Sequence, residues 1–249
     1  MIPKRIITCW FGPKTTQRKE IEEVCLASLK EHFKDYEFLE INESNFPINQ
    51  FTYAKMSYDR HFYAFVADVA RLWALYNYGG IYFDTDVFVL KNFDEELLNN
   101  NAFIGSCMNE ETIDKTDELI SAGVIGAEKG SQFILNVLNR FCQKEIYDMK
   151  ESSLLFMKSL KEEVLDYTKL LKEDFILQLP FRLRKLTIYP YDYVTCCFWR
   201  SKKLVLTKNS YAIHLYAGVW TDKQYEEKVK NRILKMFKEI KENEYGRNI

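Results

Sequence analysis

Two adjacent glycines, Gly79 and Gly80, separate a segment with helical periodicity from a segment rich in aromatic and β-branched residues. Apolar side chains recur at helical spacing over residues 59–78, which predicts a helix with one buried face. Glycine tolerates the left-handed conformation that ends a helix, so the pair predicts where this helix stops. Residues 81–90 contain neither glycine nor proline and are predicted to form one central strand.

Two pairs of polar residues interrupt this apolar segment. Asp68 and Arg71 are three positions apart, so they share one face of the predicted helix. Asp84 and Asp86 are two positions apart, so in an extended chain both side chains point to the same side, with Cα atoms about 7 Å apart. Two such carboxylates repel each other, and a hard divalent cation removes the repulsion because it prefers oxygen ligands. The pair therefore indicates a metal site; a charged strand end in a turn is the alternative.

The composition is that of one globular domain, which is expected to span residues 1–249. The 249 residues are 47% hydrophobic and 29% charged, enough for a sizeable core. The net charge of -1 gives no electrostatic reason to expect a nucleic-acid partner. The start of the chain does not read as a signal peptide, and no apolar run reaches about 18 residues, so no membrane span is expected. Six cysteines without C-x-x-C spacing are expected to be reduced thiols in a cytoplasmic protein.

The order of the remaining predicted elements favours an α/β fold. Strands are predicted at residues 5–11, 36–41, 102–108 and 119–127, and helices at residues 19–33 and 131–141. Strand, helix and strand in succession argue for a mainly parallel central sheet flanked by crossover helices. Residues 47–58 are expected to be a loop with a helical turn. Residues 222–249 are predicted to form a docked or exposed amphipathic helix, with at most weak attraction to a membrane surface.

Two further features leave alternatives open. Gly123 and Gly126 allow something to approach the backbone of residues 119–127 closely. A tight β-bulge is one explanation, and a segment that faces the donor or acceptor is the alternative implied by the family resemblance described below. His214 lies between Ile213 and Leu215 on a short apolar strand. A histidine in that setting is either a satisfied core residue or a ligand.

The constellation Asp68-x-x-Arg71 followed by L-Y-N-Y-G-G-I-Y-F-D-T-D over residues 75–86 resembles the sugar-binding region of glycosyltransferases with a D-x-D motif. It is most similar to the Och1-like and capsular-polysaccharide group, glycosyltransferase family 32, and distantly similar to the glucosylating clostridial toxins. The resemblance implies a GT-A fold and transfer with retention at the anomeric carbon. It also implies Mn²⁺ or Mg²⁺ as cofactor and a UDP-sugar as donor. The implied acceptor is a glycan or lipid-linked oligosaccharide of surface polysaccharide or capsule synthesis, used in the cytoplasm or at the inner face of the membrane.

The same resemblance assigns roles to individual residues. The catalytic set is Asp68, Arg71, Asp84 and Asp86. The metal ligands are Asp84, Asp86 and His214. The residues that it implies for binding of the donor nucleotide are Trp10, Phe11, Tyr82, Asp84, Gly218 and Trp220. For Trp10 and Phe11, core aromatics are the alternative, and Val219 stands where relatives often have serine.

Two other functions fit parts of the pattern. An aspartate-nucleophile phosphatase also uses D-x-D after an apolar strand, but it places threonine or valine where this chain has Phe88. A non-catalytic sugar-nucleotide-binding protein would keep the fold without turnover. The intact Asp68, Arg71, Asp84 and Asp86 argue against that second alternative.

Overall fold

The computed structural model describes residues 1–13, 15, 17–106, 120–142, 181–182, 186–197, 203–218, 231, 234–235 and 237–238. Its main feature is a seven-stranded sheet with the order β2-β1-β3-β6-β5-β8-β7, and a two-stranded sheet pairs β4 with β9. The strands are β1 Arg5–Cys9, β2 Glu37–Ile41, β3 Gly80–Phe83, β4 Val87–Val89, β5 Ala102–Ser106, β6 Ile120–Ala127, β7 Phe181–Arg182, β8 Thr187–Tyr189 and β9 Ala212–His214. The helices are α1 Glu20–His32, η1 Ile48–Gln50, α2 Thr52–Asp59, α3 Tyr63–Tyr78, α4 Glu95–Leu98, α5 Gln132–Cys142 and α7 Tyr191–Val194.

The strand directions confirm the predicted α/β class with a mostly parallel sheet. Strands β2, β1, β3, β5 and β8 run in one direction, and only β6 and β7 among the strands of this sheet run against them. The reversed β6 lies in the middle, between β3 and β5. Its start therefore lies beside the end of β3, which places two different segments at the same edge of the sheet.

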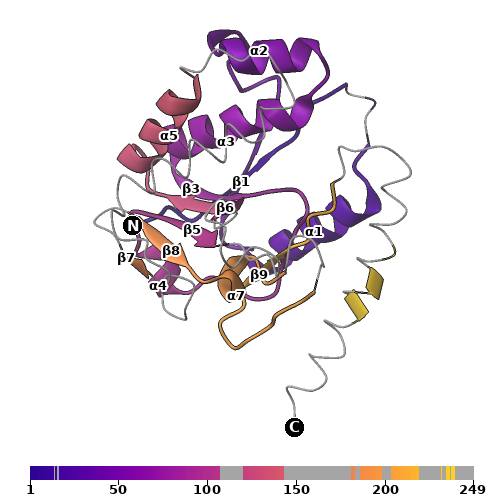
Figure 1. Cartoon of the computed structure of the whole chain (residues 1–249), viewed down its shortest axis with the longest axis vertical. Helices are drawn as coiled ribbons and strands as arrows, with labels where there is room; N and C mark the ends of the chain where they lie inside the picture. Colours follow the sequence, from indigo (N-terminus) through magenta and orange to yellow (C-terminus); the bar gives the residue numbers. More distant parts are fainter. Residues whose placement is uncertain are drawn as a thin grey trace, which may run out of the picture.

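Helices cover both faces of the sheet (Figure 1). On one face, Ile7 and Tyr82 belong to the same buried cluster as apolar residues of α3 and α5. On the other face, the neighbouring residues Ile6 and Ile81 pack with Leu29 of α1. Successive strand residues thus point to opposite faces, and both faces are apolar, as expected of a sheet buried between helical layers.

Helix α3 ends where the two glycines predict, at Gly79, whose φ is 66°. The side chain of Arg5 donates hydrogen bonds to the carbonyl oxygens of Tyr78, at 2.6 Å, and Gly79, at 3.4 Å. The predicted start at residue 59 is wrong. The backbone breaks at His61, which has a φ of 62°, so α2 ends at Asp59 and α3 begins at Tyr63. The loop predicted for residues 47–58 is instead η1 followed by most of α2.

Most of the predicted terminal helix over residues 222–249 lies outside the described residues. Within that terminal segment, Phe237 is helical, and its ring packs edge-on against Phe88 of β4 with centroids 5.1 Å apart. Among the helices of the described part of the chain, none is both long and apolar enough to cross a bilayer.

Candidate active site

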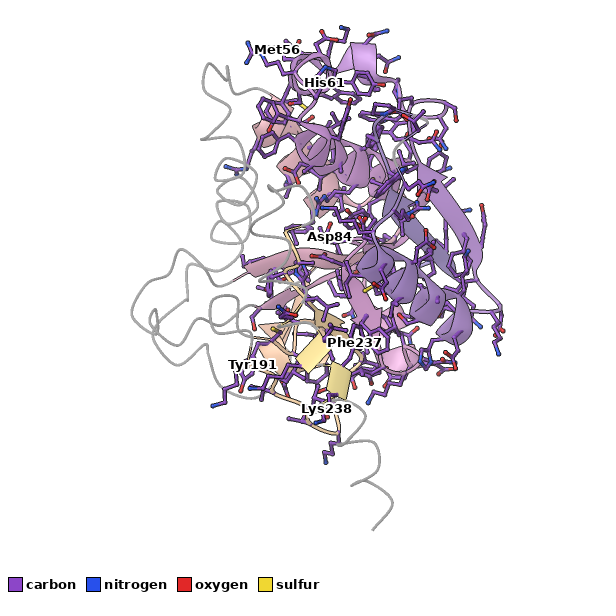
Figure 2. All side chains as sticks on the ribbon, turned by 90° about the vertical axis from the view of Figure 1, so that its right-hand side faces the viewer. Met56, His61, Asp84, Tyr191, Phe237 and Lys238 are labelled. Carbon is purple, nitrogen blue, oxygen red and sulfur yellow. The ribbon has the colours of Figure 1, made fainter. Side chains whose placement is uncertain are left out.

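The D-T-D motif forms a turn that leaves the central sheet. The prediction of one strand over residues 81–90 is wrong, because β3 ends at Phe83 and β4 begins at Val87. The N–H of Val87 donates to the carbonyl oxygen of Asp84 at 3.1 Å, which closes the turn. Beyond it, β4 pairs with β9 in the second sheet, with Val87 opposite His214. The motif therefore lies where the chain passes from one sheet to the other, near the middle of the molecule (Figure 2).

One carboxylate oxygen of each motif aspartate is held by the protein. Oδ1 of Asp84 accepts a hydrogen bond from the Tyr82 hydroxyl at 2.6 Å and lies 3.1 Å from Nη1 of Arg71. Oδ2 of Asp86 accepts from the backbone N–H of Ala217 at 2.7 Å. The turn, rather than an extended strand, brings the two carboxylates together, with one oxygen of each within 4.8 Å of the other.

The other oxygen of each aspartate faces His214. Nε2 of His214 lies 3.3 Å from Oδ1 of Asp86 and 3.7 Å from Oδ2 of Asp84. One ligand atom from each of the three side chains falls within 4.8 Å of the others. His214 is 9% exposed, so it is buried as a core residue would be, yet its ring nitrogen points at the motif. The sequence left open whether His214 is a core residue or a ligand, and the structure brings it to the two aspartates.

Arg71 anchors the network from α3. Its Nη2 donates to Oδ1 of Asp68 at 2.8 Å, and its Nη1 donates to the carbonyl oxygen of Ala122 at 3.2 Å as well as facing Asp84. Its guanidinium lies over the Tyr82 ring, 4.7 Å from the centroid. The shared helix face predicted for Asp68 and Arg71 is confirmed. Both residues are buried, at 8% and 7% exposure, so Arg71 holds its neighbours in place from within the protein.

Burial and charge set the protonation of the two buried aspartates. Burial raises the pKa of Asp68 to about 7 against the attraction of Arg71, and the nearby charge of Asp84 raises it further. Burial also acts to raise the pKa of Asp86. There it is outweighed by the charge and hydrogen bond of His214 and by the Ala217 N–H, so the pKa of Asp86 lies below its usual value. Asp86 is thus held as a carboxylate, the form that binds a cation.

A bulge in β6 supplies three contacts that sequence reasoning missed. Ile104 pairs with Ile125, but the next residue of β5, Gly105, pairs with Ser121, so residues 122–124 stand between two paired positions. The Ser121 hydroxyl lies 3.3 Å from Nδ1 of His214. The carbonyl of Ala122 accepts from Arg71, and that of Gly123 accepts from the N–H of Asp84 at 2.8 Å. The run of small residues over 121–123 was the sequence signal available for this bulge. What approaches Gly123 is the His214 ring, and what approaches Gly126 is the Phe103 ring.

Glu22 of α1 is a second residue without a sequence signal. Its side chain is 2% exposed. Oε1 accepts from the hydroxyl of Thr85, the middle residue of the motif, at 2.8 Å. Oε2 accepts from the backbone N–H of Lys19 at 2.9 Å, within the capping box that begins α1. The motif turn is thereby attached to the start of α1.

The residues assigned to donor nucleotide binding are dispersed. Trp10 follows β1 and is partly exposed, with the Arg18 guanidinium 4.6 Å from its ring centroid. Phe11 is buried and packs edge-on against Phe46, which is the core alternative left open by the sequence. Tyr82 is 2% exposed and reaches the site through its hydroxyl alone. Gly218 has a φ of 57°, and Trp220 lies outside the described residues.

The donor set fits a hard divalent cation. Within the residues that the structure describes, Asp68, Asp84 and Asp86 offer three carboxylates beside the Arg71 guanidinium, and two of them turn one edge toward the same imidazole nitrogen. Carboxylate oxygens with one imidazole suit Mg²⁺ or Mn²⁺. The bonds from Tyr82 and Ala217 fix the orientation of the ligating carboxylates, as outer-shell groups do at metal sites.

Comparisons with known proteins give similarities to glycosyltransferases. Residues 13–104 match the family model described as a glycosyltransferase sugar-binding region containing a DXD motif. No curated protein matches the sequence. Among solved structures, the PaToxG glycosyltransferase is 17% identical, with a TM-score of 0.52 over 70% of this chain and 71% of that one. A glycosyltransferase involved in glycosylation of the major capsid of PBCV-1 is 12% identical, with a TM-score of 0.48 over 91% of this chain and 98% of that one.

The matched segment includes Asp68, Arg71, Asp84 and Asp86, so the family model covers every residue of the predicted catalytic set. The likeness to PaToxG shows the fold, and this fold is the GT-A arrangement implied by the resemblance. Neither comparison points to a phosphatase. The match over residues 13–104 and the shared fold together support a transferase of the glycosyltransferase type.

Proposed function

We propose that this protein is a divalent-metal-dependent glycosyltransferase that moves a sugar, with retention, from a UDP-sugar to a glycan or lipid-linked acceptor. The observation that carries the proposal is the convergence of Asp84, Asp86 and His214 at the turn after β3, inside the segment that matches the DXD family model. The donor nucleotide, the acceptor and a place in surface polysaccharide synthesis are supported by the resemblance to the Och1-like and capsular group.

Asp84, Asp86 and His214 would hold Mn²⁺ or Mg²⁺. Such a cation, when bound, neutralises the negative charge that builds on a departing diphosphate. The protein's own part is to keep the ligands ready. Tyr82 and Arg71 hold one edge of Asp84, and the Ala217 N–H holds one edge of Asp86, so neither side chain has to reorient when the donor arrives.

Asp68 and Arg71 would shape the wall of the sugar site. Arg71 is held by Asp68, Asp84 and the Ala122 carbonyl, so its role is to position Asp84 and Asp68. Asp68 uses Oδ1 for that contact, and its second oxygen is the candidate acceptor for a sugar hydroxyl. Arg71, which the resemblance places in the catalytic set, is thus proposed to act by positioning the two aspartates, whereas Asp68 would contact the sugar.

The use of the carboxylates in the described part of the chain supports retention. An inverting enzyme needs a general base opposite the leaving group. The three carboxylates placed at this site are engaged with Arg71, Tyr82, His214 and the backbone, so the acceptor proton would pass to the departing diphosphate. The resemblance supports the same outcome, since that family transfers with retention.

The test is a thermal-shift screen of nucleotide sugars with Mn²⁺, followed by assay of donor hydrolysis and transfer. A bound donor at a hundred times its dissociation constant adds about 2.7 kcal/mol of stability. Asp86→Asn should abolish metal-dependent donor binding, and Asp59→Asn, which removes an exposed carboxylate of α2, should leave it intact. Donor binding without hydrolysis or transfer would indicate a non-catalytic binding protein. Full activity in excess EDTA would refute metal dependence.

A product with inverted configuration would refute retention. The anomeric coupling constant in the proton NMR spectrum of fresh product gives the configuration directly. An α-linked donor should give an α-linked product.

A further inference from the structure

We propose that the bulge of β6 is a cradle for His214, in which Ser121 and Gly123 make the histidine a ligand by fixing its ring position and its tautomer. This inference rests on the proposed metal-dependent function, because it explains how one ligand of that site is prepared. Ser121 and Gly123 are positioning residues here: they act through the imidazole of His214 and touch neither sugar nor diphosphate.

The first part of the cradle is the space that Gly123 leaves. A Cβ atom at position 123 would lie 2.5 Å from Nδ1 of His214, 2.7 Å from Cε1 and 3.0 Å from Cγ. Side chains do not approach so closely, so any other residue at this position would push the ring away. The ring of Tyr216 also stacks on His214, with centroids 3.9 Å apart and an interplanar angle of 30°. The imidazole therefore sits against the β6 backbone in a fixed place.

The second part is the hydroxyl of Ser121. It lies 3.3 Å from Nδ1 of His214, and it also accepts a hydrogen bond from the backbone N–H of Gly123 at 3.4 Å. A hydroxyl oxygen has two lone pairs, so it can accept from both groups at once. The side chain of Ser121 is buried at 5% exposure, which makes it the immediate partner of Nδ1 in a region closed to solvent.

The two ring nitrogens of His214 need different protonation states when a metal is bound. Nε2 faces Oδ1 of Asp86 at 3.3 Å and Oδ2 of Asp84 at 3.7 Å, the same two atoms that turn toward the proposed cation. Nε2 can bind a cation only through its lone pair, so the single proton of the neutral ring must then sit on Nδ1. A buried N–H without an acceptor is costly. Ser121 supplies that acceptor, and the bulge that pairs Ser121 with Gly105 places it there.

The first experiment measures Mn²⁺ affinity by electron paramagnetic resonance, which counts free Mn²⁺ without any need for turnover. Loss of an outer-shell partner at a metal site typically weakens metal binding about 10–100-fold, and we expect a loss of that size for Ser121→Ala. Gly123→Ala should weaken binding as much as His214→Ala, since the new methyl group occupies the place of the ring. Ser210→Ala is the matched control. Ser210 is buried and also has two hydrogen bonds, to the Asp192 carbonyl and from the Thr207 N–H, but none to His214.

The decisive step repeats both changes in the His214→Ala background. If the cradle acts through the imidazole, neither Ser121→Ala nor Gly123→Ala lowers Mn²⁺ affinity further once the imidazole is gone. Additional weakening in that background would overturn the proposal, because the effect would then be general damage to the site. Unchanged Mn²⁺ affinity in Ser121→Ala alone would overturn it as well. If Gly123→Ala does not fold, Ser121→Ala still decides.

The tautomer has its own measurement. In long-range ¹H–¹⁵N spectra of the Zn²⁺-loaded protein, we expect the proton on Nδ1 of His214, identified by its loss in His214→Ala. A proton on Nε2 with the metal bound would refute the cradle. Failure of the wild-type protein to bind Mn²⁺ refutes the proposed metal-dependent function itself. Wild-type binding and transfer with an insensitive Ser121→Ala refute only the inference about the cradle.

Discussion

The hydroxyl of Tyr82, in β3, donates a hydrogen bond of 2.6 Å to Oδ1 of Asp84, the first residue after the strand. Their side chains lie on the same side because they are two positions apart. Tyr82 is 2% exposed and its ring lies under the Arg71 guanidinium, so the donor hydroxyl is fixed in space. An apolar strand therefore ends with a rigid hydrogen-bond donor aimed at the first motif carboxylate.

Tyr82→Phe should weaken Mn²⁺ binding about 10-fold, the low end of outer-shell effects, because Asp84 loses the group that orients it. The ring and its contact with Arg71 remain, so the free energy of unfolding should fall by only about 1 kcal/mol. Electron paramagnetic resonance gives the affinity, and urea unfolding gives the stability. Tyr189→Phe is the control, since its hydroxyl bonds Asn100 instead. Equal Mn²⁺ affinity in Tyr82→Phe and wild type would contradict the assigned role.

Thr85→Val should destabilise the protein by about 1–3 kcal/mol, because the buried Glu22 carboxylate loses its hydroxyl donor and valine offers none. In the Glu22→Gln background the same change should cost less, since the acceptor is then uncharged. A double-mutant cycle by urea unfolding measures the coupling between the two side chains. Additive effects would show that the bond between Thr85 and Glu22 does not attach the motif turn to α1.

The parts of the fold that sequence predicts well are those fixed by local chemistry. The end of α3 follows from the conformational freedom of Gly79, and the shared face of Asp68 and Arg71 follows from helical spacing. The apolar strands β1 and β3 carry enough aliphatic residues to be recognised as buried. The α/β class follows from the order of these elements.

What sequence does not show are contacts between distant segments. The motif turn exists because β4 pairs with β9, whose residues come more than a hundred positions later. Ser121 reaches His214 because β6 bulges; the glycines indicate that a bulge is possible, but not which distant side chain it brings close. Glu22 reads as one more acid in an amphipathic helix until its bond to Thr85 is seen. Site residues that are held by pairings between distant segments can be identified only from the structure.

The stability of the metal-free protein should fall as pH rises from about 4 to about 7 through the contribution of Asp68. Its pKa is raised from 3.8 to about 7, first by burial. Between those values the folded state holds a proton that the unfolded state has released, so raising the pH favours unfolding. Urea unfolding in EDTA at several pH values should show this slope in wild type and a flatter one in Asp68→Asn. Asp59→Asn, an exposed control, should keep the wild-type slope. Parallel curves for Asp68→Asn and wild type would contradict the assignment.

Gly79→Ala should cost more stability than Gly130→Ala, although both glycines have positive φ, at 66° and 75°. A backbone held in that region costs a non-glycine residue about 1–3 kcal/mol. At Gly79 a Cβ would also lie 2.5 Å from the backbone nitrogen of Lys129 and 3.0 Å from Cγ of Pro3, whereas at Gly130 it meets nothing within 4 Å. The difference between the two melting temperatures reports the clash together with the backbone strain of Gly79, whose ψ of 167° lies in a region that essentially only glycine adopts. Equal losses would show that neither adds to the cost of a positive φ at the end of α3.

Arg71→Lys should fail to restore what Arg71→Met loses. The guanidinium bonds Asp68 and the Ala122 carbonyl and faces Asp84, and it lies flat over the Tyr82 ring. An ammonium is a compact charge without a planar fork, so it cannot serve those directions together. Breaking a buried ion pair typically costs about 3–5 kcal/mol, and we expect Arg71→Met to lose that much.

Arg71→Lys should recover less than half of this loss, because one ammonium reaches one carboxylate and leaves the other buried without its partner. Mn²⁺ tests whether Arg71 and the proposed cation share Asp84. Added Mn²⁺ should stabilise Arg71→Met more than wild type, because a cation at Asp84 replaces part of the missing positive charge. The excess should vanish in Arg71→Met combined with Asp84→Asn. If Mn²⁺ stabilises all three proteins equally, Arg71 and the cation do not share Asp84, and Arg71 has a purely structural role in α3.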